Sequence, residues 1–233
     1  MKICIDAGHN HSGYDTGAIG NGLREQDVTF EIADILKMLL VNIGVEVVMT
    51  RKSLTENIGT SLNSSINNRC KISNTNNCDY FISIHCNAFN TMAHGTEILV
   101  YKKQGKAEML AQRVLARIIN NIGTTNRGIK EKNIGVLRDT ICPAILIETA
   151  FIDNVTDAMI LMNNQSEIAN AIFYGICDFL NLPTSESEAI SLSTEEEKNI
   201  LKTKIGLSDE TITFLECYKY GEDLIKKIIK AVK

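Results

Sequence analysis

The stretch Tyr80-Phe81-Ile82-Ser83-Ile84-His85 decides the fold, because a mostly apolar run of five residues leads directly into a histidine. Such a run is typical of a strand buried on both faces of a sheet. The same pattern recurs at residues 3–9 and residues 144–148, which end on His9 and Glu148. Ligands bind beyond the carboxyl ends of the strands in open α/β sheets. We therefore expect these two histidines and this glutamate at one edge of a sheet.

Strand-like and helix-like segments alternate from residue 1 to about residue 182. Apolar residues at helical spacing after Glu25 predict an amphipathic helix that ends near Gly44. Further strands are expected over residues 45–49, 80–84, 95–101, 134–137 and 144–147, and further helices over residues 62–72, 110–122 and 168–179. Strands separated by helices of this length imply βαβ units. The sequence thus predicts a three-layer α/β domain with a mostly parallel sheet flanked by helices.

The composition is that of an ordinary globular protein. The 233 residues are 44% hydrophobic and 22% charged, with a net charge of -4, which provides no basic face for nucleic acid or anionic lipid. No apolar run approaches the roughly 20 residues that a membrane helix needs. The N-terminus enters a strand at once, with no signal peptide to be seen. We expect synthesis in the cytoplasm, no nucleic-acid partner and no membrane insertion.

A polar break at residues 183–192 precedes a chain end of different character. Ser193 and Thr194 each stand three residues before a glutamate, which is the capping-box pattern of a helix N-terminus. The apolar residues that follow predict three short helices, at about residues 194–205, 208–219 and 222–232. We interpret residues 193–233 as a small all-α module, joined by this linker to a catalytic domain at residues 1–182.

Four residues at strand and helix ends supply the parts of a hydrolytic zinc centre. His9, Glu25 and His85 form a His2Glu set, which binds catalytic zinc and leaves a fourth position for water. Glu148 is the expected general acid/base, because partial desolvation raises the pKa of a carboxyl group. Each residue alone has a plainer interpretation as a structural histidine, a helix N-terminal carboxylate or an ion-pair partner. Their joint placement favours a site for one Zn2+ per chain.

The same residues lie in five blocks that resemble the zinc-dependent N-acetylmuramoyl-L-alanine amidases of the Amidase_3 type. In order, the blocks are residues 5–9, 22–25, 83–88, 136–138 and 147–148. The resemblance covers essentially all of residues 1–181. It implies a twisted sheet of parallel and mixed strands flanked by helices.

The resemblance implies hydrolysis of peptidoglycan at the amide bond between the lactyl group of N-acetylmuramic acid and the L-Ala of the stem peptide. By position in the motifs, it assigns the zinc ligands to His9, Glu25 and His85. It assigns the catalytic glutamate to Glu148. Both assignments agree with the interpretation reached from the residues themselves.

Three further polar residues are substrate-binding candidates. Arg138 has the geometry to hold a stem-peptide carboxylate bidentately, although a structural role is equally expected. Asn87 either orients His85 through a hydrogen bond or shapes the turn. Glu97 lies on a strand, where alternation makes either face equally expected.

Family members that act on the growing wall are usually exported, and no signal peptide precedes the first block here. This favours a phage or prophage endolysin released through a holin pore, or a lysis amidase of a sporulating mother cell. The C-terminal module is then expected to bind a cell-wall component or to associate with itself. Residues 183–233 hold eight Lys against ten Asp and Glu, so simple attraction to anionic wall polymers is not expected.

Two other functions remain open from the sequence. One is a zinc hydrolase of another substrate, such as a carboxypeptidase or an N-deacetylase, built on a similar site. The other is a non-enzymatic wall-binding module that retains the fold. The intact set of ligands and spare carboxylate argues against the second, because a binding module needs no activated water.

Overall fold

The structure of the chain is a computed structural model that describes residues 1–184, 194–208, 210–212, 225 and 228–229. Its contacts divide the chain into two compact units, Met1–Thr184 and Ser185–Lys233. Across the residues that are described, no helix combines the length and the apolar character needed to cross a lipid bilayer.

The first unit is built on a six-stranded sheet in the order β4-β1-β5-β8-β6-β7. The strands are β1 (Lys2–Ala7), β4 (Glu46–Met49), β5 (Tyr80–Asn87), β6 (Thr96–Val100), β7 (Asn126–Glu131) and β8 (Ala144–Phe151). Strand β1 pairs in parallel with β4 and β5, and β5 pairs in parallel with β8. Strand β6 pairs antiparallel with β8 and parallel with β7. The predicted, mostly parallel sheet is confirmed, with two reversed strands at one side.

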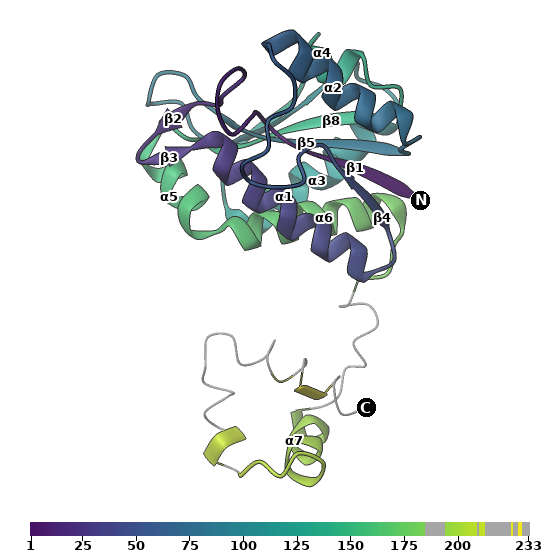
Figure 1. Ribbon diagram of the computed structural model, residues 1–233. Helices are drawn as coiled ribbons and strands as arrows, with labels where there is room; N and C mark the ends of the chain where they lie inside the picture. Colours follow the sequence, from purple (N-terminus) through teal and green to yellow (C-terminus); the bar gives the residue numbers. More distant parts are fainter. Residues whose placement is uncertain (185–193, 209, 213–224, 226–227, 230–233) are drawn as a thin grey trace. The chain divides into compact units, whose positions relative to one another are not determined.

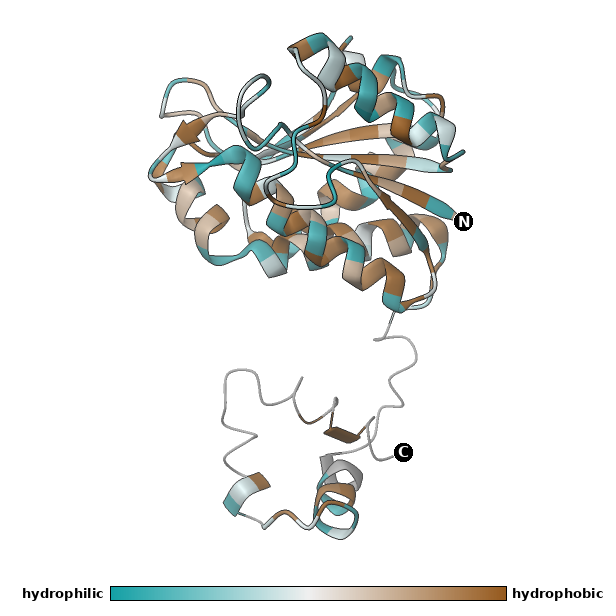
Figure 2. Cartoon of the chain, in the orientation of Figure 1, coloured by the Kyte–Doolittle hydropathy of each residue, from teal (hydrophilic) through white to brown (hydrophobic). Residues whose placement is uncertain are grey.

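Helices cover both faces of this sheet and make the three predicted layers (Figure 1). Helices α1 (Glu25–Asn42), α3 (Lys106–Ile122) and α6 (Gln165–Leu180) pack on one face. Helix α2 (Leu62–Thr75) and the short α4 (Gly135–Arg138) pack on the other. Figure 2 shows hydrophobic residues concentrated on the strands at the centre of this unit. The larger core therefore lies between the sheet and the first three helices.

The sheet face toward α2 changes from apolar to polar along the strands. Phe81 and Leu146 belong to the smaller core on this face. Side chains alternate between the two faces of a strand, so Ser83, His85 and Glu148 continue this face at the carboxyl ends of β5 and β8. The smaller core therefore borders a polar region at the carboxyl ends of β5 and β8, which contains His85 and Glu148.

Two parts of the sequence prediction are wrong or incomplete. Residues 134–137, expected as a strand, form most of helix α4, where Val136 and Leu137 are buried in the smaller core. A short apolar run has no periodicity that separates one helical turn from a strand. Strand β7 was not expected, because it is a polar edge strand with side chains in solvent. A hairpin of β2 (Ile19–Gly20) and β3 (Leu23–Arg24) and helix α5 (Val155–Asn163) complete the unit.

The second unit contains helix α7 (Thr194–Thr203), which matches the first of the three helices predicted there. After it, the N–H of Gly206, with φ of 78°, donates to the carbonyl of Lys202 at 3.1 Å and ends the helix. Four residues form a buried apolar cluster: Leu201, Ile212, Ile225 and Ile229. The helices predicted over residues 208–219 and 222–232, and the predicted linker over residues 183–192, lie largely outside the described residues.

Candidate metal centre and active site

Three side chains from three elements converge on one point beyond the end of the sheet. His9 follows β1, Glu25 begins α1, and His85 lies near the end of β5. His9 Nε2 and His85 Nδ1 lie 3.0 Å apart, and each lies 3.0 Å from Glu25 Oε1. Among the residues that the structure describes, these three form the one group of histidine, cysteine and acidic side chains close enough to hold a metal ion.

The chemistry of this donor set fits a cation better than it fits hydrogen bonds alone. If both ring nitrogens carried hydrogens for Glu25 Oε1, two donors would face each other at 3.0 Å. If only one carried a hydrogen, the other nitrogen would direct its lone pair at the carboxylate. A metal ion that accepts all three lone pairs removes this conflict. Two imidazoles and one carboxylate are a recurring ligand set for catalytic zinc.

Glu25 is held by backbone groups as well as by the two histidines. Its Oε1 accepts the N–H of Cys86 at 2.9 Å, and its Oε2 accepts the N–H of Ala18 at 2.8 Å. Burial raises the pKa of this carboxyl group, but hydrogen bonds from His85 and His9 and their charges outweigh burial and hold the pKa well below its usual value. The carboxylate is therefore ionised and fixed in place.

Two glycines leave room for the three converging side chains. A Cβ at Gly8 would lie 2.6 Å from His85 Cε1, and a Cβ at Gly17 would lie 2.6 Å from Glu25 Cβ. His9 itself has φ of 67°, a left-handed conformation that is uncommon for a residue with a side chain. Strain of this kind collects at functional sites. The backbone is thus adapted to the site at each of these positions.

A buried network behind the site orients His9. Asp15 Oδ1 lies 3.2 Å from His9 Nδ1, while Asp15 Oδ2 accepts hydrogen bonds from Ser65 Oγ at 2.6 Å and Arg69 Nη2 at 3.2 Å. Arg69 also donates to Asp6 Oδ1 at 3.2 Å. A carboxylate on the far ring nitrogen is the usual support of a metal-ligating histidine, and it leaves Nε2 free to ligate.

The same surroundings determine the proton affinity of His9. Burial lowers its pKa, but hydrogen bonds and charges from Asp15 and Glu25 outweigh burial and raise the pKa to about 9. Metal binding must therefore displace a proton from this imidazole at neutral pH.

Arg51 is a second supporting residue that the sequence did not indicate. Its side chain is fully buried and donates to the carbonyls of Ala7, Gly8, Gln26 and Leu54 at 2.6 to 3.3 Å. Gly8 precedes His9 and Gln26 follows Glu25, so one guanidinium ties together the backbone beside two of the three converging residues. Burial and the charge of Arg69 lower the pKa of Arg51 to about 10.

Glu148 lies beside the triad in the sheet. It is the register partner of His85 on β5 and of Glu97 on β6. Its Oε2 is buried and has no hydrogen-bond partner among the described residues. Burial, then the charges of Glu25 and Glu97, raise the pKa of Glu148 to about 8. An unpartnered carboxyl group with such a pKa is suited to exchanging protons near neutral pH.

The other three candidates have different surroundings. Arg138 forms a bidentate ion pair with Asp139 on the surface of α4. Asn87 Oδ1 accepts the N–H of Ala88 at 2.9 Å and shapes the turn after β5. Glu97 is bound by Arg127 and Lys130 of β7. Of these three residues, Glu97 alone is a register partner of Glu148. A substrate-binding role for Arg138, Asn87 and Glu97 stays a prediction.

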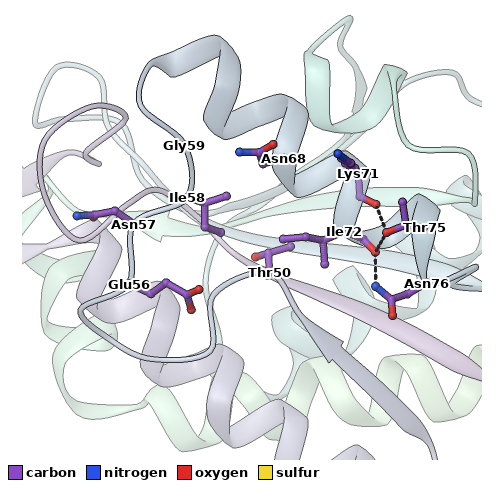
Figure 3. Close-up of a pocket in the computed structure, with 10 residues that line it drawn as sticks. All are labelled: Thr50, Glu56, Asn57, Ile58, Gly59, Asn68, Lys71, Ile72, Thr75 and Asn76. Atoms are coloured by element: carbon purple, nitrogen blue, oxygen red, sulfur yellow. Dashed lines mark hydrogen bonds between the residues drawn. The ribbon is translucent and has the colours of Figure 1, made fainter.

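A cavity of about 380 Å³ is lined by residues other than the triad. Figure 3 shows Asn57, Ile58 and Gly59 on one side of this cavity and Asn68 and Lys71 of α2 on another. The N–H of Ile58 donates to the side chain of Asn10, the residue after His9. The cavity wall thus supports the His9 loop, while the converging side chains, rather than the cavity, locate the chemistry.

Residues 3–178 match the family Amidase_3, described as N-acetylmuramoyl-L-alanine amidase. A sporulation-specific N-acetylmuramoyl-L-alanine amidase of Bacillus subtilis (strain 168) is 33% identical over 195 residues, which cover 82% of this chain and 72% of that protein. The endolysin of Bacillus phage SPP1 is 30% identical over 230 residues, which cover 94% of this chain and 81% of that protein. An uncharacterized cell wall amidase of Bacillus anthracis is 32% identical over 188 residues, 76% of this chain, but the match spans only 35% of that longer protein.

The fold agrees with a solved structure of the same kind. The N-acetylmuramoyl-L-alanine amidase AmiC2 of Nostoc punctiforme superimposes with a TM-score of 0.70 at 31% sequence identity, covering 78% of this chain and 97% of that one. The family match covers the six strands of the sheet apart from Lys2, and it includes His9, Glu25, His85 and Glu148. This chain therefore belongs to the Amidase_3 family of N-acetylmuramoyl-L-alanine amidases.

Proposed function

We propose that the protein hydrolyses peptidoglycan at the amide bond between N-acetylmuramic acid and the L-Ala of the stem peptide, with the help of bound zinc. The observation that carries the proposal is the convergence of His9, Glu25 and His85 beside the unpartnered carboxyl group of Glu148. In this proposal His9 Nε2, Glu25 Oε1 and His85 Nδ1 hold the metal. When bound, zinc supplies a Lewis acid that makes hydroxide available near neutral pH and polarises the scissile carbonyl.

Glu148 performs the proton transfers in this proposal. Its Oε2 takes a proton from the attacking water and delivers it to the nitrogen of L-Ala as the carbon–nitrogen bond breaks. The carboxyl group has no competing hydrogen bond from the described residues, so it is free to face water and then the leaving amine. A cation at the triad would favour the ionised form of Glu148 that accepts the first proton.

The test is mass spectrometry of the soluble products from purified Gram-positive peptidoglycan, with and without a chelator. We expect stem peptides with a free N-terminal L-Ala, lost with the chelator and restored by zinc. New reducing ends on the glycan, or a released terminal amino acid or acetate, would contradict the amidase function. Wall binding with no product under any metal condition would favour the non-enzymatic alternative.

Substitution of Glu148 tests the proton transfers separately. Glu148→Gln keeps the size of the side chain and leaves the three ligands intact, so it should abolish turnover while one zinc per chain is retained. Near-normal activity of this variant would show that another group moves the proton.

Within this activity, we propose an endolysin role. The similarity to the phage SPP1 endolysin extends over 94% of the chain, whereas the family match ends at residue 178. Expression inside Gram-positive cells, with and without a pore-forming holin, tests the role. Lysis that requires the pore supports it, and lysis of equal speed without the pore contradicts this release route. Cleavage confined to the walls of sporulating cells would favour the sporulation alternative.

We propose that residues 193–233 serve as a module that binds a cell-wall component or another copy of the chain. The apolar cluster around Leu201 and Ile212 supports a core of its own for this part. A truncation ending at Leu182 should then lose wall binding in a co-sedimentation assay or lose mass in sedimentation equilibrium. A truncation that behaves as the full chain in both assays would contradict the proposal.

A further inference from the structure

A cluster of two cations and one carboxylate lies beside the proton-transfer residue. Lys130 Nζ and Arg127 Nε both donate to Glu97 Oε2, at 2.5 and 2.8 Å. One carboxylate faces two cations, so the cluster carries a net charge of +1.

The register of the sheet fixes where this cluster stands. His85, Glu148 and Glu97 are successive register partners across β5, β8 and β6, and register partners share one face of a sheet. Lys130 of β7 is the register partner of Leu99, which lies on β6 two residues after Glu97. The order across the sheet is therefore the metal triad, the proton-transfer carboxyl group and then the cations.

The cations are held in place yet open to a ligand. The guanidinium of Arg127 stacks over the Phe151 ring, 4.8 Å from its centroid, and donates to the carbonyl of His94 at 3.2 Å. The side chains of Arg127 and Lys130 keep 32% and 39% of their surface exposed, whereas that of Glu97 keeps 9%. The buried carboxylate thus fixes two cations whose side chains stay partly exposed to solvent.

Resting on the proposed function, we infer that Arg127 and Lys130 bind a free carboxylate of the stem peptide on the leaving-group side of the scissile bond. The glycan side of that bond offers no carboxylate, whereas the peptide side does. In the proposed function Glu148 protonates the leaving nitrogen, and the cations lie on the side of Glu148 away from the triad, so a peptide that extends from Glu148 toward β6 and β7 reaches them. The second peptide residue lies within about 7 Å of that nitrogen. Strand β7 lies two strand spacings, or about 10 Å, from β8, and the long side chains of Arg127 and Lys130 span the difference.

The residue after L-Ala in such peptides is a D-glutamyl residue, whose α-carboxyl group is either free or amidated. The subsite should therefore distinguish stem-peptide substrates that carry D-Glu from those that carry D-isoglutamine after L-Ala. The γ-carboxyl group is joined to the next residue of the peptide in both, so the two substrates differ only by an α-carboxylate and an α-carboxamide. Hydrogen bonds to charged groups are strong enough to give the carboxylate substrate a roughly 10- to 100-fold higher kcat/KM. Added salt should reduce this preference, because the interacting groups are exposed.

The experiment measures kcat/KM on both substrates with the full-length zinc-loaded protein and its variants. Lys130→Gln should lower the preference for the carboxylate, and Arg127→Gln with Lys130→Gln should bring the ratio close to one, chiefly through KM. Glu97→Gln should act in the opposite direction, because it retains both cations and removes the charge that offsets one of them. Lys37→Gln is the matched control, since Lys37 is an exposed lysine paired with Asp34 on α1, on the other face of the sheet.

The outcomes separate the subsite from the proposed function. Equal losses on both substrates would mean that the cations only support Glu97 and would overturn the subsite, as would a wild-type ratio near one. A Glu97→Gln variant with an unchanged ratio would overturn it as well, even if the double variant does not fold. If no variant and no wild-type sample releases a free L-Ala amine from either substrate, the proposed function itself fails.

Discussion

The Glu148→Gln substitution is expected to stabilise the metal-free protein while it removes catalysis. The folded protein keeps a proton on Glu148 up to a pH of about 8, whereas the carboxyl group ordinarily loses it near 4.5. Between these values, unfolding releases a proton, so the stability of the wild type falls as pH rises. Glutamine mimics the protonated acid at every pH and does not incur this loss.

The size of the effect follows from the two pKa values. Linkage gives a cost for Glu148 of about 1 kcal/mol at pH 5 and about 4 kcal/mol at pH 8. The stability gap between Glu148→Gln and the wild type should therefore widen by about 3 kcal/mol over this range. Burying the amide of the new glutamine has a free-energy cost that does not depend on pH. This cost shifts the stability difference from wild type equally at pH 5 and pH 8, so it does not affect the change between them.

The assay is denaturant unfolding followed by circular dichroism, in the presence of a chelator and at several pH values from 5 to 8. Glu97→Gln is the matched control on the neighbouring strand. Burial raises the pKa of Glu97, but Lys130 and Arg127 outweigh burial and lower it. The stabilising contribution of Glu97 is present above its ordinary pKa and is lost only as pH falls through its folded pKa, so it does not change between pH 5 and 8. Because the charge of Glu97 adds to burial and to Glu25 in raising the pKa of Glu148, the gap between Glu97→Gln and wild type should change with pH, but much less than the gap for Glu148→Gln. A gap for Glu148→Gln that stays constant or narrows would refute the reasoning.

Three further predictions concern metal binding. His85→Ala should lose both bound zinc and turnover, measured by metal analysis after dialysis and by product release; one retained zinc per chain would contradict its role as a ligand. Asp15→Asn should weaken zinc affinity 10- to 100-fold. The amide cannot accept hydrogen bonds from both Arg69 and His9 as the carboxylate does, so His9 is no longer held in place. A competition titration that gives an unchanged zinc affinity would argue against this role. Gly8→Ala would bring a methyl group 2.6 Å from His85 Cε1, so it should reduce both the zinc content and the melting temperature. A normal zinc content would show that the His85 imidazole moves aside without loss of metal binding.

Much of the first unit could be predicted from local sequence. The strands that carry His85 and Glu148 are buried on both faces, so their apolar runs stand out, and the polar residue that ends each run is conspicuous. Glu25 was found because it begins a long amphipathic helix. By contrast, the apolar run at residues 134–137 predicts a strand where the chain forms α4. Strand β7 is a polar edge strand, so the sequence has no apolar pattern that predicts it.

The supporting residues could not be predicted for a different physical reason. Arg51, Arg69 and Asp15 look like ordinary surface residues in the sequence. Only tertiary contacts bury the two arginines and bring Asp15 to Arg69. Arg69 meets Asp6 across 63 positions of the chain, and Arg51 meets Gln26 across 25. No local pattern encodes such contacts. The sequence thus predicts the three residues that converge, but it does not predict the residues that orient them.

The parallel pairing of β1 with β5 determines when the proposed metal site can form during folding. Ala7 pairs with Ile84 in this register, and only this pairing brings His9 and His85, separated by 76 positions, to 3.0 Å. Closing so long a loop is a late and entropically costly step for an unfolded chain. Zinc should therefore leave the rate of refolding nearly unchanged and slow the rate of unfolding instead, because it binds an arrangement that exists only once the sheet has formed.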